Sequence, residues 1–180
     1  MRDQRARAIA HPETPVGKHR AKLFASGSNQ IKDAIFRKYY IEAICLVESW
    51  ISDRLECYLS NFKGKPYAFK TLDNLVRQFE ESNEIELNPE LKSLVIGDVK
   101  VWKDKRNTAA HEMMKIESGD YSSWDERLAR NRAPAVDGLK LLRKVDNLIT
   151  RLKRTAKKSS LNKRASPAVE IKGVNRGSGK

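Results

Sequence analysis

Apolar residues recur at steps of three and four along most of this chain, which is the spacing of a helix face that packs on a core. The longest such pattern predicts a helix from about Gln30 to Ser60, ended by Gly64 and Pro66. Its apolar positions are Phe36, Tyr40, Ala43, Val47, Trp50, Ile51, Leu55, Tyr58 and Leu59. On its polar side, Asp53, Arg54 and Glu56 fit either a charged helix face or part of a site.

Two further helices are predicted in the middle of the chain. One runs from about Tyr67 to Glu81 on a stripe of leucine, valine and phenylalanine. The next has a clear start, because Asn88 is a good cap and Pro89 suits the first helical position. Its stripe continues to Trp102, and Gly97 within it suggests a close helix contact.

The second half of the chain predicts three more helical pieces. The first covers about Thr108 to Glu117, either as a separate helix or as the end of one kinked helix with the preceding piece. A capping box at Ser123–Glu126 begins a short helix that reaches about Asn131. A last helix begins at Pro134 and keeps its apolar stripe to about Lys157. The predicted fold is therefore all-α, a bundle of four main helices plus one or two short ones.

Both ends of the chain lack this periodicity. Residues 1–29 contain several prolines, glycines and serines and are predicted to be a flexible arm. Residues 158–180 are rich in Ser, Gly, Lys and Arg and are predicted to be a disordered tail. Residues 30–157 would then form the single helical domain, which fits the length of 180 residues.

The net charge of +13 lies entirely in the first thirty and the last thirty residues. Residues 1–30 carry +4, residues 151–180 carry +9, and the residues between them are neutral. Basic arms on a neutral body indicate a polyanionic partner such as RNA, while solubilising tails are the alternative. The chain shows no apolar run that could span a bilayer and no secretory signal, so a cytoplasmic location without membrane contact is expected.

The cysteines and histidines argue against metal or disulfide chemistry. Cys45 and Cys57 are twelve residues apart on one predicted helix, which places them about 18 Å apart along its axis. A disulfide needs Cα atoms within about 7 Å, so both are expected to be buried thiols in a reducing compartment. No group of Cys, His and acidic residues has the spacing of a zinc site, and no cofactor motif is present.

The candidate chemistry lies between Lys103 and Glu112, where Arg106, Asn107 and His111 occur together. Arginine offers a permanent charge and a planar fork of donors for phosphate, and histidine transfers protons near neutral pH. Five positions turn an α-helix through about 500°, so Arg106 and His111 would lie about 140° apart. Either the helix is interrupted between them, where Asn107 could cap it, or a second chain completes the site. The alternative is a surface arginine and a core histidine that do not meet.

This stretch resembles the HEPN family, whose signature is an arginine, four to six residues, and then a histidine. Arg106, Asn107 and His111 match the signature, including its frequent polar residue after the arginine. The resemblance covers about residues 30–157 and implies a two-fold dimer with both motifs in one cleft. It also implies a toxin or phage-defence ribonuclease with a cognate antitoxin. The family's modifiable tyrosine, two places after the histidine, is Met113 here, which departs from that pattern.

The leading hypothesis is a metal-independent endoribonuclease that leaves a 2′,3′-cyclic phosphate. His111 would be the general acid or base, Arg106 would bind the scissile phosphate, and Asn107 would orient it. The second hypothesis is a non-catalytic HEPN-like protein that binds RNA or a partner protein, with Arg106 paired to Asp104 or Glu112. A DNA-binding regulator fits less well, because the basic excess lies in the ends rather than on a recognition helix.

Overall fold

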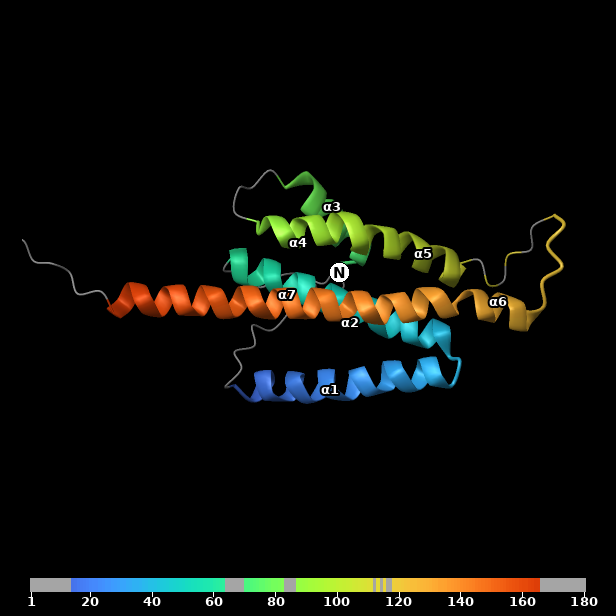
Figure 1. Ribbon diagram of the computed structural model, residues 1–180, viewed down its shortest axis with the longest axis horizontal. Coiled ribbons are helices and arrows are strands. Elements are labelled where there is room, and N and C mark those ends of the chain that lie inside the picture. Colours follow the sequence, from blue (N-terminus) through green and yellow to red (C-terminus); the bar gives the residue numbers. More distant parts are fainter. Residues whose placement is uncertain are drawn as a thin grey trace, which may run out of the picture. The chain divides into compact units, whose positions relative to one another are not determined.

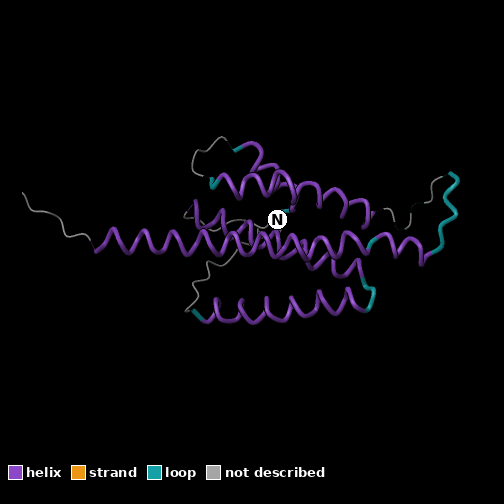
Figure 2. Tube along the Cα trace, viewed as in Figure 1, coloured by secondary structure: helices purple, strands orange, loops and turns teal. Residues whose placement is uncertain are grey.

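The computed structural model describes the backbone of residues 14–63, 70–82, 87–111, 113, 115 and 118–165, and their side chains except at 61–63, 110–111 and 157–165. All regular structure in these residues is helical, which confirms the all-α prediction (Figures 1 and 2). The elements are α1 (Pro15–Phe36), α2 (Tyr40–Lys63), α3 (Leu72–Glu81), α4 (Pro89–Leu94), the π-helical η1 (Val95–Val99), α5 (Lys100–His111), α6 (Trp124–Arg130) and α7 (Arg132–Ala165). The chain divides into two compact units, Met1–Ile149 and Thr150–Lys180.

The core of the first unit forms around α2. Helix α1 packs on α2, and α3 packs on α2, η1 and α5. The side chains that are at most 1% exposed include Ile31, Ile44, Val47, Ile51, Leu55, Leu75, Val76, Phe79, Leu91, Val95, Val99, Val145 and Ile149. Burying each of these stabilises the fold by about 1.5–3 kcal/mol relative to an exposed side chain, so the apolar stripes decide how the helices pack.

The predicted flexible arm at residues 1–29 is wrong from Pro15 onward, where α1 begins. Thr14 caps this helix, and its side-chain oxygen accepts a hydrogen bond from an amide of the first turn. The ring of Phe24 stacks on Trp50 of α2 with centroids 4.8 Å apart. Glycines and serines weaken the local pattern, but contacts with α2 hold this segment in a helix. Residues 1–13 lie outside the described residues.

The single helix predicted for residues 30–60 is instead two helices joined by a tight turn (Figure 1). Lys38 in this turn has a φ of 65°, the left-handed conformation that reverses the chain. Phe36, predicted to face the core, is 86% exposed, whereas Tyr40 is only 7% exposed. The apolar stripe is continuous in sequence because the two helices bury their faces against each other.

Local signals in the middle of the chain predict the helix starts with mixed success. The cap at Asn88 is confirmed, since its side chain accepts from the Leu91 amide at 3.1 Å. Helix α3 begins only at Leu72, after Thr71 as cap, and residues 64–69 lie outside the described residues. The close contact expected at Gly97 is wrong, because a Cβ built there meets nothing within 4 Å. This glycine instead lies in η1, the π-helical segment.

The later helices differ from the prediction mainly at their ends. The capping box of Ser123 and Glu126 is confirmed at the start of α6. Helix α7 begins at Arg132, two residues before Pro134, and its backbone stays helical to Ala165. The disorder predicted from residue 158 is therefore wrong for 158–165, where Lys, Arg, Leu and Ala favour a helix by intrinsic propensity. Residues 166–180 of the predicted tail lie outside the described residues.

Candidate functional site

Arg106 lies on α5 with its side chain 17% exposed and directed toward α2. One guanidinium nitrogen forms an ion pair with Glu48 of α2, and the other donates to the Asn107 side-chain oxygen at 2.7 Å. Its Nε is buried and has no hydrogen-bond partner among the described residues. Burial lowers the pKa of this guanidinium, but arginine keeps its charge at neutral pH. Arg106 is thus a positioned, charged fork with donors still available.

Arg106 and Asn107 line a cleft of about 540 Å³ between α2, the start of α3 and α5. A cleft of this size is within the usual range of about 300–1,000 Å³ for small-molecule sites. Its wall carries charges of both signs, with Lys103 bound to Asp73 at 2.6 Å. The lining also includes Cys45, Glu48, Ser49, Ser52, Asp53, Glu56, Lys70 and Thr71. Charged and polar residues therefore make up most of the cleft lining around the arginine.

Of the three charged residues flagged on the long predicted helix, two line this cleft and one does not. Asp53 and Glu56 both line the cleft. Glu56 is only 2% exposed, accepts from the Lys70 amide at 2.8 Å, and has its pKa raised by burial. It therefore does not belong to a solvated charged face. Arg54 forms an ion pair with Asp146 of α7 and has no place in the cleft lining.

The helix interruption considered between Arg106 and His111 is absent, because α5 continues through both residues. Asn107 does not cap a new helix but accepts a hydrogen bond from Arg106. On a continuous helix, positions 106 and 111 are about 140° apart, whereas positions 107 and 111 are separated by about 40°. The structure thus brings Arg106 and Asn107 together. The side chain of His111 lies outside the described residues, so its meeting with Arg106 stays a prediction.

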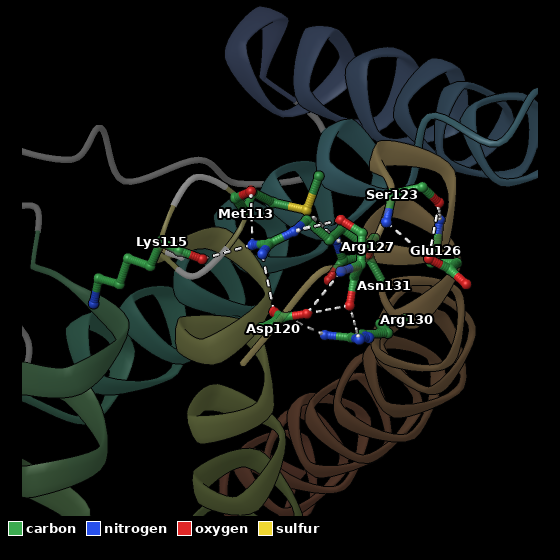
Figure 3. Close-up of polar contacts among 9 residues, drawn as sticks. Met113, Lys115, Asp120, Ser123, Glu126, Arg127, Arg130 and Asn131 are labelled. Atoms are coloured by element: carbon green, nitrogen blue, oxygen red, sulfur yellow. Dashed lines mark hydrogen bonds and ion pairs between the residues drawn. The ribbon is translucent and has the colours of Figure 1, made fainter. Parts of the chain in front are cut away.

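The chain beyond His111 is held by a polar cluster centred on Arg127 of α6 (Figure 3). Arg127 donates to the Lys115 carbonyl at 2.6 Å and pairs with Asp120 at 2.9 Å. Hydrogen bonds from Ser122, together with the nearby arginines, lower the pKa of Asp120. Asn131 donates to the sulfur of Met113 at 2.9 Å. These contacts fix residues 113, 115 and 120 beside the C-terminal end of α5.

Glu48 is the site residue that sequence reasoning missed. The pairing of Arg106 with Asp104 or Glu112, expected for a structural arginine, is wrong for Asp104, which contacts Lys103 at 3.4 Å. Glu112 lies outside the described residues. A signal was present, since Glu48, Ser52 and Glu56 follow one another at four-residue steps through a largely apolar helix. Such a polar stripe marks a helix face that meets polar groups rather than core.

We expect Glu48→Ala to lower the free energy of unfolding by about 1–2 kcal/mol, since a mostly buried guanidinium loses its charged acceptor. Adding Arg106→Met to this variant should restore part of the lost stability, because the unpaired positive charge is then removed. Urea denaturation followed by circular dichroism compares the single and double variants. A double variant less stable than Glu48→Ala alone would contradict the ion pair.

The two cysteines and the acidic groups give no sign of a redox or metal centre within the described part of the chain. Cys45 and Cys57 are both free thiols, as predicted, but Cys45 is exposed and Cys57 is half-buried rather than buried. No set of three or more His, Cys, Asp and Glu side chains there is arranged to hold a metal ion.

None of the described helices has the length and apolar character needed to cross a membrane. No protein-family model, curated protein or solved structure matches the chain.

Proposed function

We propose that this chain is a metal-independent endoribonuclease of HEPN type. The observation that carries the proposal is the pairing of Arg106 and Asn107 on the wall of a cleft lined mostly by charged and polar residues, about one helical turn before His111. A guanidinium fork held in place by a carboxylate is suited to bind a phosphate bidentately. Asn107 and His111 are four positions apart on α5, and such positions share a helix face.

RNA carries its own nucleophile, so the protein needs only to align the strand, move protons and stabilise charge. The 2′-oxygen bonds to phosphorus while the bond from phosphorus to the 5′-oxygen breaks. One base takes the 2′-hydroxyl proton, and one acid gives a proton to the leaving 5′-oxygen. His111 would fill one of these roles, Arg106 would stabilise the charge on the phosphoryl oxygens, and Asn107 would orient them. The products are a 2′,3′-cyclic phosphate and a 5′-hydroxyl.

Glu48 gives the arginine a defined orientation before RNA arrives. Arginine has five donor hydrogens, and the contacts with Glu48 and Asn107 use two of them. A phosphate can therefore bind the remaining donors or replace Glu48. Glu48 is thus a positioning residue, because it acts through Arg106 rather than on the reacting atoms.

A second copy of the chain would complete the site. On the continuous helix α5, positions 106 and 111 point about 140° apart, so one chain does not bring them to a single phosphate. A two-fold dimer can place the arginine of one chain near the histidine of its partner. The setting proposed for such an enzyme is a cytoplasmic toxin or phage-defence ribonuclease held in check by a cognate antitoxin.

We expect RNA cleavage to continue in EDTA and to leave a 2′,3′-cyclic phosphate. The reason is that the proposed roles are filled by side chains and by the 2′-hydroxyl of the substrate. Incubating the purified protein with RNA, with and without EDTA, and analysing the product ends by mass spectrometry tests this. Ends carrying a 5′-phosphate, or activity that EDTA removes, would contradict the proposed mechanism.

The alternative is a non-catalytic helical protein that binds RNA or a protein partner. The pairing of Arg106 with Glu48 and Asn107 favours it, since a purely structural arginine is held in the same way. The two functions differ in one result. Binding of RNA without any cleavage, by a dimer at saturating RNA, would support the alternative.

A further inference from the structure

The exposed aromatic side chains of the described residues are confined to two short segments. Phe36 and Tyr39 lie at the turn between α1 and α2, with 86% and 57% of their surface exposed. Tyr121 and Trp124 lie just before and at the start of α6, with 95% and 57% exposed. Large rings are normally buried because each removes much apolar surface from water, so a group left exposed indicates a binding surface.

One hollow joins these two segments. It has a volume of about 510 Å³, and Tyr39 and Trp124 both line it, together with Lys38. Its remaining lining is apolar and comes from Ile41, Met113 and Leu128. The hollow therefore presents two rings and one cation to solvent from two separate parts of the chain.

A second, smaller hollow of about 180 Å³ shares one lining residue, Met113, with the first. Its wall carries several cations, from Lys105 and Lys115 to Arg127 and Arg130. Figure 3 shows Arg127 and Arg130 in the same polar cluster, which Lys115 joins through its backbone carbonyl while its side chain extends away from Arg127. Asp120 is the acidic residue in this lining and is already paired with Arg127, so the hollow carries a net positive charge.

We propose that these two hollows, here called the aromatic–basic groove, dock a single-stranded segment of nucleic acid. Bases stack on Tyr39 and Trp124, and phosphates contact Lys38, Lys115 and Arg130. Aromatic rings interleaved with cations are the combination that binds single strands with little sequence preference. A duplex hides its base faces and cannot use the rings. The proposal rests on the proposed function for its biological role, but not for its chemistry.

The position of the groove supports this occupant over a protein partner. The smaller hollow includes Thr108 of α5, two positions after Arg106 and three before His111. Position 108 is about 60° around α5 from position 111 and about 160° from Arg106, so a strand lying in the groove would continue toward the face of α5 that carries position 111. The positive lining complements a phosphate backbone, whereas an apolar helix from a partner protein would offer no acceptor to Lys105 or Lys115.

A single-stranded oligodeoxynucleotide tests the groove separately from catalysis, because it lacks the 2′-hydroxyl that cleavage requires. We expect Trp124→Ala to weaken its binding roughly 5- to 150-fold, the effect of losing one stacked base. Trp124→Phe should retain most of the affinity, because it keeps a ring. Leu23→Ala is the matched control, since Leu23 is 61% exposed on α1 and lines neither hollow. Fluorescence anisotropy of a labelled oligonucleotide measures all four proteins.

The cationic half of the groove has its own expected result. Lys115→Ala should lower the slope of log affinity against log salt by about 0.7, the value for one phosphate contact on a single strand. Trp124→Ala should leave that slope unchanged. Comparing the two variants therefore separates the contribution of base stacking to the affinity from that of the phosphate contacts.

The proposal is overturned if Trp124→Ala binds the oligonucleotide as tightly as the unaltered chain, or if a duplex of equal length binds equally well. It is also overturned if Trp124→Ala instead dissociates a dimer in sedimentation, because the groove then holds a protein. Retained oligonucleotide binding without RNA cleavage would remove the proposed ribonuclease function and leave the groove intact. If Trp124→Ala leaves oligonucleotide binding unchanged while the protein still cleaves RNA, the groove proposal is removed and the proposed ribonuclease function stands.

Discussion

Replacing Arg106 with alanine is expected to lower the rate of RNA cleavage by at least about 10²–10³-fold. The guanidinium is the charged fork on the cleft wall, and the charge that develops on the phosphoryl oxygens would lose its main donor. His111→Ala should cost about 10²–10⁴-fold, the usual contribution of a general acid or base. A single-turnover assay at saturating RNA measures both losses without the effect of weaker binding.

Two controls make this result specific to chemistry. Arg106→Lys keeps the positive charge but loses the planar fork, so its rate should fall between those of the unaltered chain and Arg106→Ala. Lys103→Ala removes a cation that lines the same cleft but is bound to Asp73, and it should cleave nearly normally. Unimpaired cleavage by Arg106→Ala would exclude Arg106 as the phosphate-binding residue.

The ion pair with Glu48 needs a control of its own. Arg106→Ala leaves a carboxylate that is 25% exposed without its cation, which could lower stability and so lower activity indirectly. The double variant Arg106→Ala with Glu48→Gln removes that unpaired charge. If the proposed role is right, the double variant regains stability in urea denaturation but stays inactive.

Two helix starts were predictable because their signals are local. The cap at Asn88 and the capping box at Ser123 lie within four residues of the amides they bind, so the sequence itself holds both partners. Helix α1 was not predictable in the same way. Its face is defined by contacts such as Phe24 on Trp50, whose partners are 26 positions apart. A window of a dozen residues contains one partner without the other.

The same difference between local and long-range signals applies to the candidate site. Arg106 and Asn107 are adjacent, so a short motif identifies both. Glu48 is 58 positions away and reaches Arg106 only because α2 and α5 pack together. The aromatic–basic groove was likewise hidden, because Tyr39 and Trp124 meet only after α1 and α2 separate at Lys38. The sequence pattern predicted one long helix through Lys38 and Tyr39, with Phe36 facing the core of the fold.

Gly138→Ala is expected to destabilise the fold by about 3 kcal/mol, the upper end for overpacking. A Cβ at this buried position of α7 would lie 2.7 Å from Nε1 of Trp102 on α5. The indole cannot easily move aside, because its Nε1 donates to the Pro134 carbonyl at 2.8 Å. Trp102 lies one turn before Arg106, so a displaced ring should also reduce cleavage.

The expected loss of stability in Gly138→Ala is opposite to the usual effect of replacing a helical glycine with alanine. Alanine in a helix is normally more stable than glycine by about 0.5–1 kcal/mol, so a simple propensity argument predicts stabilisation. Gly97→Ala is the matched control, because that glycine is also helical and a Cβ there meets nothing within 4 Å. Thermal unfolding should therefore shift upward for Gly97→Ala and downward for Gly138→Ala. Stabilisation by both substitutions would mean that α7 does not press against Trp102, and that α5 is held in place by α2 and α3 alone.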